Sequence, residues 1–149
     1  MISLSDLYKP FPSSAIRWRV GALTKDKDKC IPLAYIDARD VMERLDSVVG
    51  GDKWACRYPF IGCCELSIKI GNEWVTKSNC AGETNVEAEK GQASDAFKRA
   101  AVLWGIGRYL YDIPPFWVPV NQYKQMEQNT LEDIKNRLIK WEQNYFKGK

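Results

Sequence analysis

Two adjacent cationic residues, Lys98 and Arg99, are the side chains of this sequence whose type and position most directly suggest chemistry. They lie in the segment SDAFKRAAVLWGIGRYLY, where small and aromatic residues surround them. Lysine and arginine neutralise phosphate groups, so a cationic pair on a helix predicts a contact with nucleic acid. The alternative is a solvated helix surface on which Asp95 pairs with one of them, a contact worth only about 0.3 to 0.5 kcal/mol.

A second candidate for phosphate binding is the strand expected around residues 16 to 20. Arg17 and Arg19 alternate there with Ile16, Trp18 and Val20, which is the period of a half-buried strand with one basic face. The alternative is that these charges protect an exposed strand edge from unwanted pairing.

The segment from 54 to 80 predicts a meander of three strands that carries two further lysines. Gly71-Asn72 has the composition of a two-residue hairpin loop, and this register places Lys69 opposite Trp74. Lys69 and Lys77 are candidates for phosphate contacts, although lysines also alternate on ordinary solvated sheets. Aromatic residues of this region are candidates for base stacking or for the core, namely Trp54, Tyr58 and Trp74.

The Lys98-Arg99 pair must be positioned by a long helix, which the pattern predicts from residue 84 to 111. Thr84 and Glu87 form a capping-box pattern at its start. Apolar residues then recur at spacings of three and four, as on a helix that packs against a sheet. Gly105 and Gly107 weaken its last turn, and Arg108 suits the negative end of the helix dipole.

The remaining elements give an α+β fold class. We expect a short helix at 3–9, a hairpin of strands at 16–20 and 31–36, a helix from the N-cap Asp37 to 49, the meander, the long helix, an extended segment at 113–120 and an amphipathic helix at 130–146. The hairpin and the three-stranded meander would pack on the long helix, in the order β-β-α-β-β-β-α, followed by the C-terminal helix. At 149 residues this predicts a single domain, with a core at about 10–115 and a C-terminal part at 116–149.

Composition excludes several classes of function. The formal charge of +3 is only mildly basic, so a phosphate-binding surface must come from local clustering. The sequence has no histidine, which excludes a Cys/His zinc site, a histidine base and a serine-type triad. No apolar run is long enough for a membrane span, so we expect an intracellular, soluble protein. The five cysteines show no CxxC spacing and are interpreted as reduced core thiols, namely Cys30, Cys56, Cys63, Cys64 and Cys80.

The runs AYIDARDVMERLDSVVGGDKW and EAEKGQASDAFKRAAVLWGIGRYLY, together with the meander between them, resemble the Rad-fifty-two family of single-strand DNA annealing proteins, and Sak-type phage recombinases among them. The resemblance implies subunits that join into a ring or filament and hold single-stranded DNA in a basic groove, without ATP or another cofactor. It implies a role in homologous recombination or DNA repair, in the cytoplasm of a bacterial host if the chain is phage-encoded, with a single-strand-binding protein or exonuclease as further partner.

The family pattern assigns the groove directly to Lys98 and Arg99. In the helix after Tyr35, Asp40 falls where a basic residue is expected, and Arg39 lies one position earlier. A third basic position, one turn after Arg99, is occupied here by Val102 or Leu103.

Two other function classes remain open from the sequence. A metal-dependent nuclease would need clustered carboxylates, and Asp37 and Asp40 lie one helical turn apart, where capping also explains them. An oligomeric interaction scaffold would use the same basic surface for an acidic protein. The annealing interpretation expects no catalytic residue and no metal.

Overall fold

A computed structural model describes residues 3–81 and 88–148, with side chains for all of these except 88–90. The chain divides into two compact units, each described by itself. The first unit comprises residues 1–10 and 36–109, and the second comprises residues 11–35 and 110–149. A single domain over 1–149 stays a prediction.

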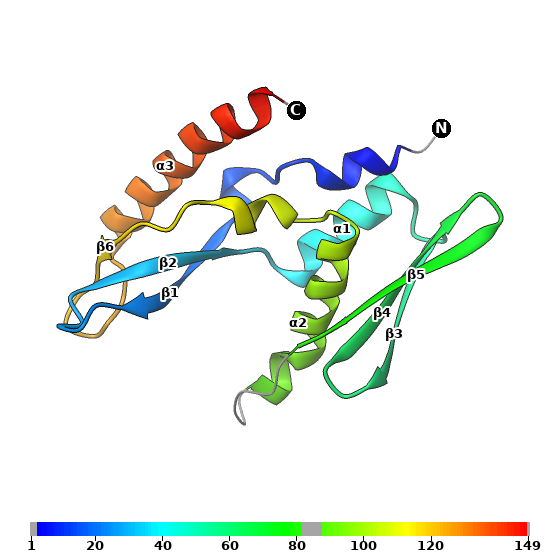
Figure 1. The fold of residues 1–149 in the computed structure, drawn as a ribbon, viewed down its shortest axis with the longest axis horizontal. Coiled ribbons are helices and arrows are strands. Elements are labelled where there is room, and N and C mark those ends of the chain that lie inside the picture. Colours follow the sequence, from blue (N-terminus) through cyan, green and yellow to red (C-terminus); the bar gives the residue numbers. More distant parts are fainter. Residues whose placement is uncertain (1–2, 82–87, 149) are drawn as a thin grey trace. The chain divides into compact units, whose positions relative to one another are not determined.

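The first unit contains a three-stranded sheet and two helices (Figure 1). After the short 3-10 helix η1 (Leu4–Tyr8), its elements are α1 (Ala38–Val48), β3 (Trp54–Phe60), β4 (Cys63–Ile70), β5 (Glu73–Cys80) and α2 (Ala88–Leu103). The strands pair antiparallel in the order β3-β4-β5, and α2 packs against β4, β5 and α1. The predicted meander is therefore confirmed.

Alternation along β4 explains why the sheet and α2 pack together. Cys64, Leu66 and Ile68 are buried on one face of β4, and α2 buries Phe97 along with small alanines. The indole Nε1 of Trp104 donates a hydrogen bond of 3.1 Å to the carbonyl oxygen of Leu66. The buried face of β4, on which every second residue lies, and the buried face of α2 therefore form one apolar layer.

The long helix is shorter than predicted, because α2 ends at Leu103 rather than at residue 111. Gly105 and Gly107 adopt positive φ angles of 98° and 73°, which end the helix, and a second 3-10 helix follows (η3, Arg108–Asp112). A Cβ atom at Gly105 would lie 2.5 Å from the ring of Tyr8, so this backbone also has to make room for the ring. The predicted capping box of Thr84 and Glu87 lies outside the described residues.

The second unit contains a small sheet and the C-terminal helix. Its elements are the 3-10 helix η2 (Ser13–Ala15), β1 (Arg17–Leu23), β2 (Lys29–Tyr35), β6 (Val118–Pro119) and α3 (Gln128–Lys147). The strands pair antiparallel in the order β1-β2-β6, so the proline-rich segment adds a short strand that the sequence did not predict. Cys30, Val118 and Ile134 form the core of this unit.

The interpretation of all five cysteines as reduced core thiols is wrong. Cys63 and Cys80 form a disulfide, because the β4–β5 register places them directly opposite each other. Cys56 is exposed, whereas Cys30 and Cys64 are buried free thiols as expected. Burial raises the pKa of the Cys64 thiol to about 11.

The α+β class is confirmed, with two small antiparallel sheets and the expected C-terminal helix. None of the helices in the described part of the chain has the length and apolar character needed to cross a membrane.

Candidate nucleic-acid interface

Lys98 and Arg99 lie on the side of α2 opposite its packed face. Ala96, Phe97 and Ala100 are buried, whereas Lys98 is half-buried and Arg99 is exposed. The guanidinium Nε of Arg99 lies 3.4 Å from Oδ2 of Asp95, and the two side chains are 47% and 51% exposed. The contact with Asp95 foreseen from the sequence is thus present for Arg99. A solvated pair of this kind contributes about 0.2 to 1 kcal/mol, which a phosphate group can replace.

Two more cations bind the C-terminal carbonyl groups of α2. The ammonium of Lys77, from β5, donates to the Leu103 carbonyl at 3.2 Å and lies 4.5 Å from the centroid of the Trp104 ring. The guanidinium of Arg108 donates to the carbonyls of Val102 at 3.0 Å and Leu103 at 2.8 Å. These contacts pair carbonyl groups that have no partner within the helix. They also place positive charge at the negative end of the helix dipole, which is favourable. We call Lys77, Lys98, Arg99 and Arg108 the basic end of α2.

This geometry bears on the third basic position that the resemblance implies near Val102 or Leu103. Neither side chain is charged, but the carbonyls of these two residues hold Lys77 and Arg108. Positive charge therefore reaches this turn of α2 from other elements. Sequence reasoning named Lys77 for its strand and Arg108 only for the helix dipole, because neither contact is visible without the folded backbone.

Arg39 is an exposed residue in the first turn of α1. A cation at this end of a helix opposes the dipole, so helix stability does not account for it. The helix start is stabilised instead by a reciprocal capping box, in which Asp40 accepts the Asp37 backbone NH at 3.3 Å. Asp37 is the N-cap, as predicted.

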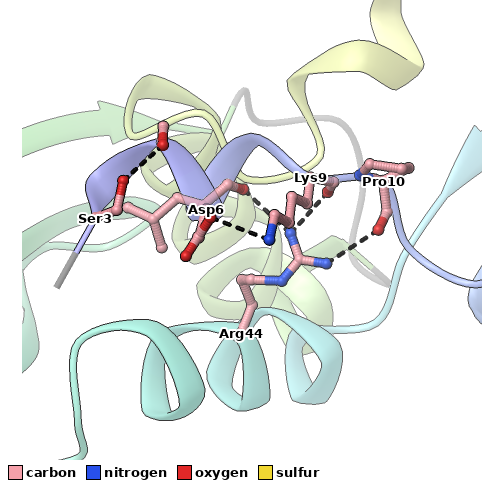
Figure 2. A network of polar contacts seen from close by, with 7 residues as sticks. Ser3, Asp6, Lys9, Pro10 and Arg44 are labelled. Atoms are coloured by element: carbon pink, nitrogen blue, oxygen red, sulfur yellow. Dashed lines mark hydrogen bonds and ion pairs between the residues drawn. The ribbon is translucent and has the colours of Figure 1, made fainter. Parts of the chain in front are cut away.

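Arg44, on the same helix, has a different role from Arg39. Its guanidinium donates to the carbonyl oxygens of Leu7, Lys9 and Pro10 at 3.2, 2.7 and 3.2 Å (Figure 2). Burial lowers the pKa of Arg44. The arginine thus holds the N-terminal segment of the first unit on α1 and is not available as a surface cation.

The meander places its two lysines on opposite faces. Lys69 pairs with Trp74 across β4 and β5, as predicted, whereas Lys77 pairs with Leu66 on the face that packs on α2. Trp74 is 50% exposed, and its register partner Lys69 lies on the same outer face of this sheet. One strand of DNA on a single face of the sheet cannot contact both lysines.

Arg17 and Arg19 belong to the second unit. Both are exposed on β1, and their register partners on β2 are Tyr35 and Leu33. The predicted alternation is confirmed, since Trp18 and Val20 between them pack against the core of this unit. Roles of Arg17 and Arg19 in nucleic-acid binding stay predictions.

The aromatic candidates of the meander divide in two. Trp54 packs on Phe97 with ring centroids 6.0 Å apart, and its indole Nε1 donates to Asp46 at 2.7 Å. Trp54 therefore has a structural explanation. Tyr58 and Trp74 are 44% and 50% exposed and keep surface for stacking on bases.

Carboxylates do not gather into a cation site within residues 3–81 and 88–148. No group of three or more Cys, Asp or Glu side chains is arranged there to hold a metal ion. Asp37 and Asp40, the pair considered for a nuclease, are engaged in the capping box of α1.

Comparison with known proteins agrees with these features. Residues 61–129 match the profile described as Rad52/22 family double-strand break repair protein. That range contains the whole basic end of α2, whereas Arg17, Arg19 and Arg39 lie outside it. No solved structure shows a significant match.

Two relatives carry the name single-stranded DNA-binding protein DdrA. The protein from Deinococcus deserti is 40% identical over 135 residues, which cover 83% of this chain and 66% of the relative. The protein from Deinococcus radiodurans is 38% identical over 125 residues, or 78% of this chain and 60% of the relative. The chain thus spans somewhat less than two thirds of the length of these relatives. From the matching profile and this identity over most of its length, the chain belongs to the Rad52/22 family.

Proposed function

We propose that this chain binds single-stranded DNA through the basic end of α2 and anneals complementary strands in recombination or repair, without nucleotide hydrolysis. The two relatives are named for single-stranded DNA binding, and they align with most of this chain. Contacts to phosphate hold a strand without reading its sequence, so the bases stay available for pairing.

The observation that carries the proposal is the arrangement of charge around the last turns of α2. Lys98 and Arg99 project from the helix, and Lys77 and Arg108 neutralise its terminal carbonyls. A phosphate that approaches Lys98 or Arg99 therefore does not meet the uncompensated negative end of a helix. Asp95 pairs with Arg99 on this surface, and their contact is exposed.

Self-association is part of the proposal. One copy offers few cations, so useful affinity for a long strand needs several copies side by side. Phe60, at the end of β3, is 73% exposed, and Ile61, in the turn that follows, is 89% exposed. Strands β3 and β5 are both edge strands of their sheet. Exposed apolar side chains beside open strand edges favour contacts between copies, in a ring or a filament. A single-strand-binding protein or exonuclease as partner, and a phage-encoded origin, are further proposals from the resemblance.

The decisive experiment mixes two complementary oligonucleotides with the purified chain, with chelator and without nucleotide. Faster duplex formation than in buffer is the expected result. Cleavage that chelator abolishes would support the nuclease instead, and self-association without any DNA binding would support the scaffold.

The site assignment is tested by replacing Lys98 and Arg99 with alanine together. We expect weaker binding of single-stranded DNA. The slope of the logarithm of the binding constant against the logarithm of the salt concentration should also become smaller in magnitude by roughly one to two. The matched control is Lys25→Ala with Lys27→Ala, which removes the same charge from the turn between β1 and β2. Equal losses in both double variants, with unchanged melting temperatures and native mass, would refute a specific role for α2.

A further inference from the structure

The second unit contains an aromatic pocket that the proposed function has not used. It has a volume of about 240 Å³ and lies between β1, the proline-rich segment and α3. Its walls are mainly rings, contributed by Trp18, Pro114, Pro115, Phe116 and Trp141, with Arg137 beside them. All of these residues belong to the second unit, so the pocket is defined within one compact body.

The rings that line the pocket are fixed by packing against other side chains of this unit, so the pocket is preformed. Trp18 and Phe116 pack against the core of Cys30, Val118 and Ile134, and their ring centroids lie 6.4 Å apart in an edge-on arrangement. Trp141 stacks on Tyr145 with centroids 4.6 Å apart. Binding of a flat ring would therefore require little ordering of the walls.

Arg137 supplies a positive charge whose pairing capacity is unused. Its guanidinium carbon lies 4.5 Å from the centroid of the Phe116 ring. Within residues 3–81 and 88–148, Arg137 makes this ring contact and no carboxylate pairs with it. An exposed guanidinium that is stacked on a ring keeps its donors directed outward, and phosphate is an anion that arginine binds in a bidentate manner.

Size and chemistry together identify the ligand class. A cavity of about 150 Å³ lined by apolar side chains is large enough to bind benzene, so this larger pocket accommodates the ring of a nucleobase. Aromatic walls stack on any base, and a neighbouring arginine adds a cation–π or phosphate contact.

We propose that this pocket holds one unpaired base of a bound single strand, with Arg137 on an adjoining phosphate. The proposal rests on the proposed function, since it assumes that the strand is single-stranded DNA. It adds a second type of contact, to the base rather than to phosphate alone. A base held in this way is withdrawn from pairing, so the contact would fix the strand at intervals while the remaining bases stay available.

The first test uses the unmodified chain. Thymidine oligonucleotides that contain 5-iodouracil are irradiated in complex with the protein, and the cross-linked peptides are identified by mass spectrometry. Cross-links on the peptides of Trp18, Phe116 or Trp141 are expected. Cross-links confined to other peptides would overturn base capture.

The second test compares an oligothymidylate with an abasic oligomer of equal length, which has the same phosphates and no bases. We expect the unmodified chain to prefer the thymidine oligomer, and Trp141→Ala to reduce that preference at least fivefold. Trp141→Phe keeps a ring and should restore most of the preference. Lys98→Ala with Arg99→Ala should lower the affinity for both oligomers by the same factor and leave the preference for the thymidine oligomer unchanged.

The outcomes separate the two proposals. Equal binding of both oligomers by the unmodified chain would overturn base capture and leave phosphate binding standing. Binding of neither would refute the proposed function itself. If Trp141→Ala changes the native mass but not the preference for bases, the pocket receives a side chain of another copy, and base capture is wrong.

Discussion

Asp95 lies one helical turn before Arg99 and places Oδ2 3.4 Å from the guanidinium Nε, in a pair whose side chains are about half exposed. The acid thus competes with any phosphate for the same guanidinium.

Asp95→Asn should therefore strengthen the binding of single-stranded DNA. The variant removes the competing charge and keeps the size of the side chain. An exposed pair is worth up to about 1 kcal/mol, so the gain in affinity should not exceed about fivefold at low salt. Fluorescence anisotropy at several salt concentrations measures it. Weaker binding by Asp95→Asn would mean that Asp95 orients Arg99 rather than competing for it.

Gly105→Ala should destabilise the first unit, because an alanine there has to adopt a φ near 98° and its Cβ would overlap the Tyr8 ring. We expect a loss of about 1 to 3 kcal/mol in the free energy of unfolding, measured by chemical denaturation.

Gly91→Ala is the matched control for Gly105→Ala. Gly91 lies within α2, and a Cβ atom added to it has nothing within 4 Å. Alanine is the better helix former, so this variant should gain about 0.5 to 1 kcal/mol. Losses of equal size at both glycines would contradict the account of how α2 ends.

Loss of the Cys63–Cys80 disulfide should lower the stability of the meander. The two residues are 17 positions apart, and closing a loop of about this length contributes about 3 kcal/mol in the chain-entropy description. Cys63→Ser with Cys80→Ser should melt at a lower temperature than the parent chain. Cys56→Ser, at an exposed free thiol, is the control and should change little. A parent chain whose melting temperature is insensitive to reductant would count against the disulfide.

Arg44→Gln should release the N-terminal segment, because three carbonyl oxygens lose a charged donor. Hydrogen bonds of charged groups contribute about 1.5 to 3 kcal/mol, so both unfolding and protease cleavage near residues 3–10 should become easier. Arg39→Gln, on the exposed start of the same helix, should leave stability within about 0.5 kcal/mol and weaken DNA binding instead. The reverse result would exchange the roles of Arg39 and Arg44.

Most of the fold was accessible from the sequence because local patterns decide it. The Gly71-Asn72 loop set the register of β4 and β5, and the alternation around Trp18 identified β1. The same register also implies that Cys63 faces Cys80. The number of cysteines and their spacing along the chain do not reveal this pairing. The end of α2 was misplaced by eight residues because the positive φ of Gly105 depends on the packing of Tyr8, which is distant in sequence.

Less of the site could be predicted from the sequence, because several of its charged side chains come together only through contacts with the folded backbone. Lys98 and Arg99 could be found as neighbours in sequence. The contacts of Lys77 and Arg108 with the carbonyls of Val102 and Leu103 depend on β5 lying beside α2, and no local pattern encodes this. Strand β6 and the pocket around Trp141 likewise arise from segments that are far apart along the chain.

The tethering of Lys77 and Arg108 affects how a salt titration of this protein should be interpreted. The ions counted in such a titration are released from the DNA, when a cation of the protein comes close enough to neutralise a phosphate. Lys77 and Arg108 keep their full charge, because backbone carbonyls are neutral, but their hydrogen bonds fix where these charges lie. They add to the slope only where a phosphate reaches those fixed positions, so the slope reports whether the strand passes beside these two anchored charges.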